Sequence, residues 1–382
     1  MNANRVRLAV LLIGLLSALL LLACGEKKGE EKTAEVDESA AAADEKTAAE
    51  KAEAEKKAEL EKKVAEVKKI FADSLHATGA GMKHWYDKGF KQVVGMEYEK
   101  LDCKNCHVKS CEACHEKGDY EADVCKDNCL ECHSRYKTTV AMDKAAGIED
   151  PHAEMDCTKC HPISDMHGDG KKWASMRERG FVKADCLDCH QEGKEGASKY
   201  DPSIDSHSAH GDKLTCEACH VSNTIACLNC HFDKFLETGS RAGNFVKGKD
   251  WLLLVNYQDK VTAGTMMSLV TEGKAYATFA PYTSHSITAE GRQCGDCHGT
   301  ETMQKVAKGK SVPIAEFEDG GLEMAEGVIP LAEGKIDIAF MDKNEKGEWI
   351  EMKPKGEPTI TVSEYGEYLT EDQLKKLAEK MD

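Results

Sequence analysis

The strongest constraint on this chain is a five-residue motif, C-x-x-C-H, which occurs eight times in 382 residues. Chance at this composition would supply on the order of 0.03 such matches. The two cysteines are spaced to form thioethers with the two vinyl groups of one haem, and the adjacent histidine then faces the iron. The motifs therefore predict eight covalently bound c-type haems. They begin at Cys103, Cys111, Cys129, Cys157, Cys186, Cys216, Cys227 and Cys294.

Zinc sites and disulfides use the same residue types but explain the pattern less well. Zinc fingers and ribbons need ligands in groups of four, whereas every C-x-x-C here is followed directly by histidine. Disulfides suit an exported protein, yet strained bridges between cysteines three residues apart would leave the histidines unexplained. In the stretch CKNCHVKSCEACH (103–115) only three residues separate two motifs, so we expect the two haems there to pack together.

The N-terminus has the features of an export signal, predicted over residues 1–23. Arg5 and Arg7 precede an apolar run at 8–23, which is shorter than the roughly 20 residues of a transmembrane helix. The run ends in LLAC (21–24), which resembles a bacterial lipoprotein lipobox and implies lipidation of Cys24. An uncleaved short anchor and a secreted protein are the alternatives. Export also fits c-type haem, which bacteria attach outside the cytoplasmic membrane.

The next segment, residues 24–75, predicts a charged tether that becomes a helix. Residues 25–56 are mostly Glu, Lys, Ala and Asp and cannot bury a core. Leu60, Val64, Val67, Phe71 and Leu75 then recur at helical spacing, which predicts a helix over about 44–76 with one apolar face. A stalk is the main interpretation, and a coiled-coil dimer is the alternative. The formal net charge of −17 argues against a nucleic-acid partner.

Two further regions follow the stalk. Residues 76–245 contain seven of the motifs and show little periodicity, with short helices predicted near 171–180 and 232–238. Residues 246–382 contain the eighth motif in a small β-containing region. Strands are predicted at 251–258 and 274–280, a hairpin at 335–352 and a terminal helix at 370–381, where Thr370 and Gln373 are spaced as a capping box.

On these eight motifs, the chain resembles the bacterial multihaem c-type cytochromes, and among them an octahaem member. The resemblance covers residues 76–300 and implies a mainly helical and irregular fold in which porphyrins supply the apolar core. No C-x-x-C-K variant occurs, the form that marks the catalytic haem of pentahaem nitrite reductases. The haem-attaching cysteines are Cys103, Cys106, Cys111, Cys114, Cys129, Cys132, Cys157, Cys160, Cys186, Cys189, Cys216, Cys219, Cys227, Cys230, Cys294 and Cys297.

The fifteen histidines nearly match the axial positions of eight irons. The proximal ligands are His107, His115, His133, His161, His190, His220, His231 and His298. The distal candidates are His76, His84, His152, His167, His207, His210 and His285. Seven distal candidates for eight irons favour bis-histidine ligation of most haems. His152 and His210 lie shortly upstream of a motif, where bis-histidine cytochromes often place a ligand to a neighbouring haem.

At least one iron therefore lacks a distal histidine from its own chain. It could take Met, Lys or Cys, with Met82, Met155 and Met166 near other ligands, borrow a histidine from another subunit, or stay open to substrate. Cys125 is left without an assigned role. A buried inert thiol is the default interpretation, with a distal thiolate or an intersubunit bridge as alternatives.

Two kinds of function fit this cofactor set. The main interpretation is a membrane-anchored relay in anaerobic or extracellular respiration, between a quinol-oxidising donor and a terminal acceptor, on the periplasmic face of either membrane or at the cell surface. The alternative is an enzyme whose open iron reduces nitrite, hydroxylamine or a sulfur oxyanion. His167 with Lys171 and Lys172 weakly suggests an anion pocket, although a solvated loop explains them better, so no catalytic residue is assigned. A filament of subunits sharing a histidine is a third interpretation.

Overall fold

The computed structural model describes residues 38–381 apart from 102–103, 105–106, 118, 122–123, 125, 230–243, 248–249 and 319–320. Several predictions fall outside these residues. They concern the signal peptide, the helix at 232–238 and six site residues: Cys24, Cys103, Cys106, Cys125, Cys230 and His231. The chain divides into two compact units, residues 1–62 and 63–382.

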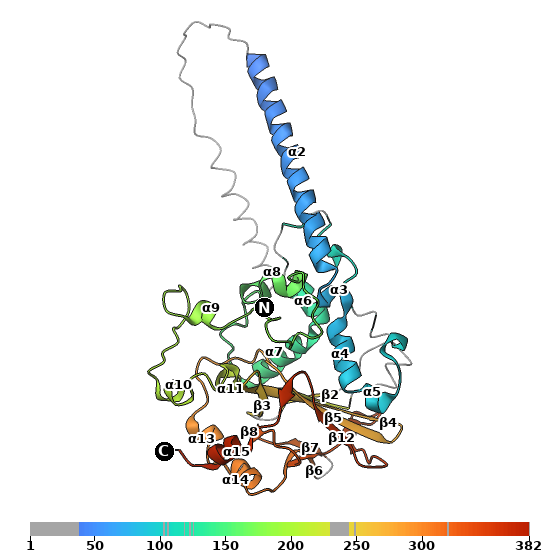
Figure 1. The fold of residues 1–382 in the computed structure, drawn as a ribbon, viewed down its shortest axis with the longest axis vertical. Coiled ribbons are helices and arrows are strands. Elements are labelled where there is room, and N and C mark those ends of the chain that lie inside the picture. The colour runs from blue at the N-terminus through green and yellow to red at the C-terminus, as the bar shows by residue number, and fades with distance from the viewer. Residues whose placement is uncertain are drawn as a thin grey trace, which may run out of the picture. The chain divides into compact units, whose positions relative to one another are not determined.

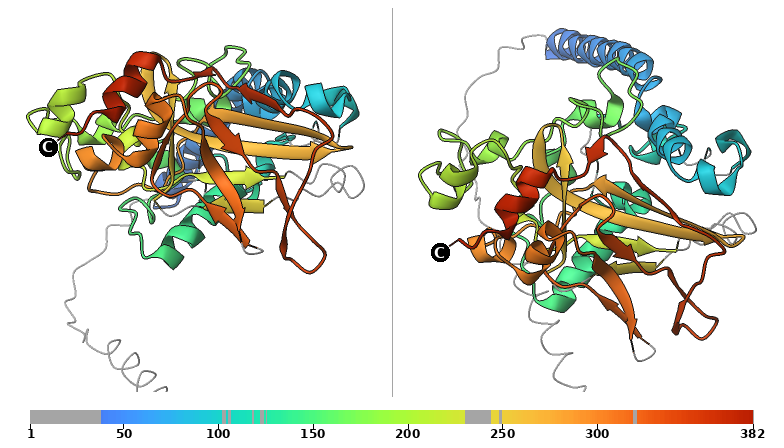
Figure 2. Two further views of the ribbon diagram at one scale, coloured as in Figure 1. Left: turned by 90° about the horizontal axis from the view of Figure 1, so that it is seen from below. Right: turned by 60° about the horizontal axis from the view of Figure 1, so that its bottom comes forward.

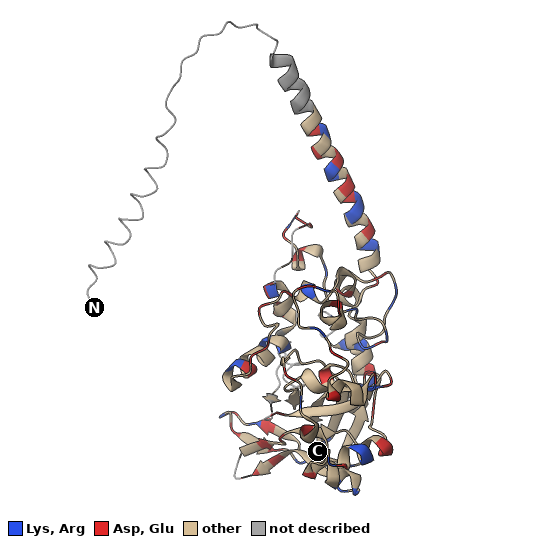
Figure 3. Ribbon diagram, turned by 90° about the vertical axis from the view of Figure 1, so that its left-hand side faces the viewer, with Lys and Arg blue, Asp and Glu red and all other residues tan. Residues whose placement is uncertain are grey.

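The predicted N-terminal helix is confirmed as α2 (Glu38–Phe71), with different ends. Acidic and basic residues are interspersed along it, as expected of a solvated helix (Figure 3). The helix ends at Phe71 rather than continuing to 76 because Ser74 begins a new helix, α3 (Leu75–Thr78). The Ser74 hydroxyl accepts a hydrogen bond from the Ala77 backbone N–H at 3.1 Å, which is an N-cap and not a helix interior.

Short helices separated by irregular chain form the region that contains most of the motifs (Figure 1). They are α4 (Ala80–Lys88), α5 (Lys91–Val94), η1 (Tyr98–Lys100), η3 (Cys111–Ala113), α6 (Lys126–Cys132), α7 (Ser134–Ala146), η4 (Cys157–Lys159), α8 (Ile163–His167), α9 (Leu187–His190), α10 (Asp205–His210) and α11 (Glu217–His220). The prediction of a helix near 171–180 is wrong, because turns and bends occupy that stretch. Gly170 and Gly180 adopt φ values of 82° and 85°, which a right-handed helix does not allow.

The C-terminal region is larger in β-structure than the sequence predicted. An eight-stranded sheet contains β1 (Ile225–Leu228), β2 (Asn244–Lys247), β3 (Leu252–Tyr257), β4 (Lys260–Thr271), β5 (Lys274–Pro281), β8 (Val328–Pro330), β12 (Thr359–Val362) and β13 (Gly366–Glu367). The long strands β4 and β5 lie antiparallel at its centre, with β3 on the other side of β4 (Figure 2). The strands predicted at 251–258 and 274–280 are thus confirmed as β3 and β5.

Two smaller sheets and three helices complete the region. One sheet contains β6 (Val312–Glu318), β7 (Gly321–Met324) and β9 (Ile336–Ile338), and the other pairs β10 (Met341–Lys343) with β11 (Trp349–Glu351). The β10–β11 pair is the predicted hairpin. The helices are α13 (Cys294–Cys297), α14 (Glu301–Ala307) and α15 (Glu371–Ala378). The predicted capping box is present, since Thr370 and Gln373 each bond the other's backbone N–H.

This region has an apolar core made of protein side chains. Trp251, Phe279, Met303 and Ile314 are fully buried, and β5 is buried along almost its whole length. A strand buried on both faces is continuously apolar rather than alternating, as the sequence of β5 is. The expectation that porphyrins must supply the core therefore does not apply here. It remains a prediction for the helical region, where buried side chains are sparse.

Candidate haem-binding site

Six of the eight motifs share one local geometry. In each, the histidine backbone N–H donates to the carbonyl of the first cysteine, four residues earlier, at 2.8 to 2.9 Å. These motifs begin at Cys111, Cys129, Cys157, Cys186, Cys216 and Cys294. One helical turn places residues i, i+3 and i+4 on one side of the backbone. Both thiols and the imidazole of a motif can therefore face one ligand.

Each of those six motif histidines faces one histidine from outside the motifs. The ring centroids are 6.0 to 6.5 Å apart: His115 with His167, His133 with His76, His161 with His285, His190 with His152, His220 with His207, and His298 with His210. An iron bound to two imidazole nitrogens at about 2 Å each holds the ring centroids about 6.3 Å apart. The spacing is thus that of two axial ligands on one metal, and the residues fit a haem.

Hydrogen bonds at the second ring nitrogen orient seven of the paired histidines. The Nδ1 atoms of His76, His190, His207, His210, His220 and His298 lie 2.6 to 3.1 Å from backbone carbonyl oxygens, and that of His161 lies 3.1 Å from the Asp165 carboxylate. A carbonyl oxygen can only accept, so Nδ1 carries the proton. The unprotonated nitrogen of each ring is then Nε2, the one that a metal needs.

Burial keeps several of these rings neutral. Burial, with a smaller contribution from the nearby His161, lowers the pKa of His285 to about 4. Burial also lowers the pKa of His76, His133 and His167. Neutral imidazole is the form that binds a metal. These histidines are therefore better suited to bind a metal than to act as charged surface side chains.

Exposed apolar side chains gather around the middle motifs. Ile163, Met176, Leu187 and Ile204 are 40 to 68% exposed, and all lie between residues 160 and 210. Soluble proteins seldom leave so many large apolar side chains open in one short segment. Flat apolar groups between the paired rings would cover such side chains, which is a second way in which the residues fit haem.

Two predicted ligands among the described residues lie outside these pairs. His84 on α4 stacks on Tyr365 with ring centroids 5.5 Å apart, and its Nε2 lies 3.8 Å from the buried Glu364 carboxylate. His107 lies beside Gly79, which also neighbours the side chains of Met82 and Tyr98. Neither histidine has a ring contact with a second histidine in the described part of the chain. Their ligand roles stay predictions.

The seventh motif differs from the other six where it is described. Cys227 is a buried residue of β1, paired with Phe245 of β2 and Met267 of β4. It begins no helical turn. The cause is local sequence, because Thr224 to Leu228 is an apolar, β-branched run that fits the sheet.

The structure does not bring His167, Lys171 and Lys172 together into an anion pocket. Lys172 pairs with Asp73 at 3.4 Å and is largely exposed, while Lys171 lies over the Trp173 ring at 5.4 Å. His167 instead faces His115. The solvated-loop interpretation of the lysines is the better one.

Sequence reasoning missed two groups of polar residues. Asp165 is buried and joins His161 to the Lys183 backbone N–H at 3.1 Å. Arg177, Arg179, Tyr257 and Tyr365 line a cavity of about 470 Å³. These contacts join segments up to 188 residues apart, from Arg177 to Tyr365, and no spacing in the sequence signals them.

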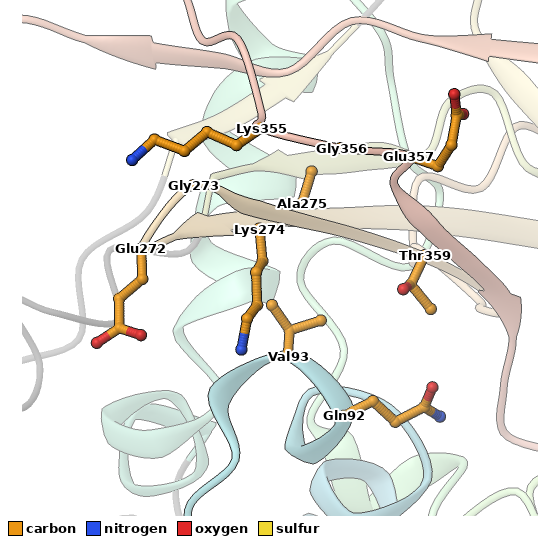
Figure 4. Close-up of a pocket in the computed structure, with 10 residues that line it drawn as sticks. All are labelled: Gln92, Val93, Glu272, Gly273, Lys274, Ala275, Lys355, Gly356, Glu357 and Thr359. Carbon is orange, nitrogen blue, oxygen red and sulfur yellow. The ribbon is translucent and has the colours of Figure 1, made fainter.

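A second cavity, of about 200 Å³, lies where α5 meets the β4–β5 turn (Figure 4). Glu272, Lys274, Lys355 and Glu357 line it, so its charges balance. It contains no cysteine or histidine, and we assign it no role.

One curated protein is similar to part of this chain. Over 178 residues the chain is 26% identical to the dissimilatory sulfite reductase MccA of Wolinella succinogenes. The match covers 35% of this chain and 24% of MccA, so the chain spans about a quarter of that relative's length. No protein-family model and no solved structure matches. Within the described residues, no helix is both long and apolar enough to cross a membrane.

Proposed function

We propose that this chain is a multihaem c-type cytochrome that reduces a small oxyanion, with sulfite and related sulfur oxyanions as the first substrates to test. The proposal rests above all on the six histidine pairs, whose spacing and Nδ1 hydrogen bonds suit axial ligation. The partial similarity to a dissimilatory sulfite reductase directs the choice of substrate class. Each haem, when bound, supplies a one-electron centre, and one with an open axial position supplies a place for the anion.

The ligand count supports an open position. Six motif histidines are paired, which leaves His107 and His231 to share the one remaining non-motif histidine, His84. If all eight motifs bind haem, at least one iron has no distal histidine from this chain. Substrate reduction needs such a position, and this favours a reductase over a chain of saturated irons only.

An electron relay is the second candidate, because six saturated irons are well suited to transfer and not to substrate binding. In that case Met82, beside His107, or a histidine from another copy would fill the remaining position. A filament or other oligomer that shares a histidine is the corresponding assembly.

Localisation and partners follow from the N-terminal signal. We propose that Cys24 carries a lipid that anchors the exported protein to a membrane. The donor would be a quinol-oxidising protein and, for a relay, the acceptor a further reductase or cytochrome. The net charge of −17 gives no support to a nucleic-acid partner.

The test is a titration of the purified, haem-loaded full chain. We expect a high-spin component in the low-temperature electron paramagnetic resonance spectrum that shifts on adding sulfite but not sulfate, and consumption of sulfite when a reduced viologen supplies electrons. Nitrite and hydroxylamine, added in parallel, separate the substrate classes. A wholly low-spin spectrum that no anion changes would overturn the reductase proposal and leave the relay.

A further inference from the structure

We propose that six haem-attachment sites, each named by its first cysteine, form one linear series in the order Cys111, Cys129, Cys157, Cys186, Cys216 and Cys294. The Cys227 site, seventh in sequence, is not a member of this series. The inference rests on the proposed haem binding but not on any substrate. Direct contacts between each site and the next support it.

The Cys111 and Cys129 sites touch through α6. The Asn128 side-chain amide, next to Cys129, donates to the Cys114 carbonyl at 2.6 Å. On the other side of the Cys129 site, the Lys126 ammonium donates to the carbonyl of Ala153, four residues before Cys157, at 2.5 Å. The first three sites are therefore consecutive neighbours in space.

A ring contact supports the second of these links. Tyr136, one turn beyond the Cys129 motif, lies 5.5 Å from the His285 ring. His285 is the histidine that faces His161 of the Cys157 site. The Cys129 and Cys157 sites thus meet on the ligand side as well as through Lys126.

The Cys157 and Cys186 sites share ligands and their supports. His152, five residues before Cys157, faces His190 of the Cys186 site. Asp165 bonds both His161 and the Lys183 backbone N–H, three residues before Cys186. His152, which lies upstream of the Cys157 motif, therefore pairs with the histidine of the next motif, at Cys186.

The Cys186 and Cys216 sites meet through Tyr200. Its backbone N–H donates to the His190 carbonyl at 2.7 Å, and its ring lies 4.7 Å from that of His207. His207 faces His220 of the Cys216 site.

The next neighbour is the Cys294 site. The Arg292 backbone N–H, two residues before Cys294, donates to the Cys219 carbonyl at 3.1 Å. His210, six residues before Cys216, faces His298. The Cys216 site is therefore joined to Cys294 both by backbone and by a ligand.

The Cys227 site lies elsewhere. Cys227 is in β1, and the carbonyl of Ile225 in that strand accepts a hydrogen bond from Arg135 at 2.8 Å. Arg135 is two residues beyond His133, so the described part of the Cys227 site is beside the Cys129 site. It would be a side branch at the Cys129 site, and the six-site series does not pass through it.

The series gives electrons one route between its ends. One end is His298, whose ring nitrogen Nδ1 bonds the backbone of the exposed Lys376 on α15. The other is His115, in the motif that follows His107 after three residues. An electron introduced at the α15 end must pass the Cys216, Cys186, Cys157 and Cys129 sites in that order.

A transit experiment tests the order. In the full haem-loaded chain with Cys125→Ser, Lys376→Cys would carry a ruthenium photoreductant beside the Cys294 site. One distal histidine at a time is replaced by methionine, which raises the potential of that site and gives it a distinct absorption band. The variants are His210→Met, His152→Met and His167→Met, which mark the first, third and sixth positions from the label.

We expect the marked site to become reduced soonest in His210→Met, later in His152→Met and last in His167→Met. Arrival at the His167→Met site before the His152→Met site would overturn the series. Iron positions from anomalous diffraction of the haem-loaded protein give an independent answer. The inference is wrong if the iron of the Cys227 site lies between those of Cys216 and Cys294. Neither readout depends on substrate turnover, so a failure of the reductase proposal is distinguishable.

Discussion

Replacing His207 with alanine tests the ligand assignment at a single site. The His207 ring faces that of His220 at 6.5 Å, the widest of the six pairs, and its Nδ1 bonds the Asp201 carbonyl at 2.7 Å. No other histidine ring contacts that of His220 in the described part of the chain. Its iron would therefore lose its sixth ligand, and we expect one additional high-spin iron per chain.

The same substitution should leave the fold intact. It removes one exposed hydrogen bond, worth about 0.5 to 1.5 kcal/mol. A domain with a stability of about 5 to 15 kcal/mol tolerates that loss. The new signal would thus come from ligation and not from unfolding, and an unchanged haem-to-protein ratio verifies this.

The assay is spin quantitation by low-temperature electron paramagnetic resonance, with His84→Ala as the matched control. His84 contacts Tyr365 and Glu364 instead of a described motif histidine. We expect His84→Ala to add at most one high-spin iron, and only if it serves the His107 or His231 motif. If His207→Ala leaves the high-spin fraction unchanged at full haem content, the ring pairs are not axial ligands and the reasoning fails.

Two further predictions concern the β-containing region. Gly264→Ala should destabilise the protein by about 1 to 3 kcal/mol, because the new Cβ would lie 2.9 Å from Val255 across the β3–β4 pair. Gly356→Ala, in open space, is the control, and equal melting temperatures for the two variants would contradict the packing argument. Thr370→Ala should cost about 1 kcal/mol in a denaturant titration, since it removes the hydroxyl that caps α15. Thr370→Ser keeps a hydroxyl that can bond the Gln373 N–H, so its free energy of unfolding should stay close to that of the unsubstituted protein.

Local patterns predicted local structure well. The mainly apolar runs at 251–258 and 274–280 form β3 and β5, and the capping box at Thr370 starts α15. Such features depend on neighbours within a few residues, which the sequence displays directly. The two wrong helix predictions, at the end of α2 and near 171–180, also have local causes. Ser74 capped a new helix where a continuous one was expected, and glycines with left-handed φ values prevented a helix near 171–180.

The extent of the sheet was not predictable from the same patterns. Its strands β12 and β13 are short, and β1 overlaps a C-x-x-C-H motif. Each pairs with a strand far along the chain, as β12 does with β5. Pairing with distant strands supplies the hydrogen bonds that hold such short segments, and the local sequence does not predict that pairing.

The sequence by itself determined where haem attachment is expected in this protein. Two cysteines and a histidine in one helical turn suffice to define a haem-attachment motif, so the motifs and their histidines could be named without a fold. Only the tertiary structure decided which histidine faces which, because partners such as His161 and His285 lie 124 residues apart. It likewise placed the Cys294 site beside the Cys216 site, through the contact of Arg292 with Cys219. The physical reason is that attachment needs contacts within five residues, whereas axial pairing and the order of sites arise from how distant segments pack.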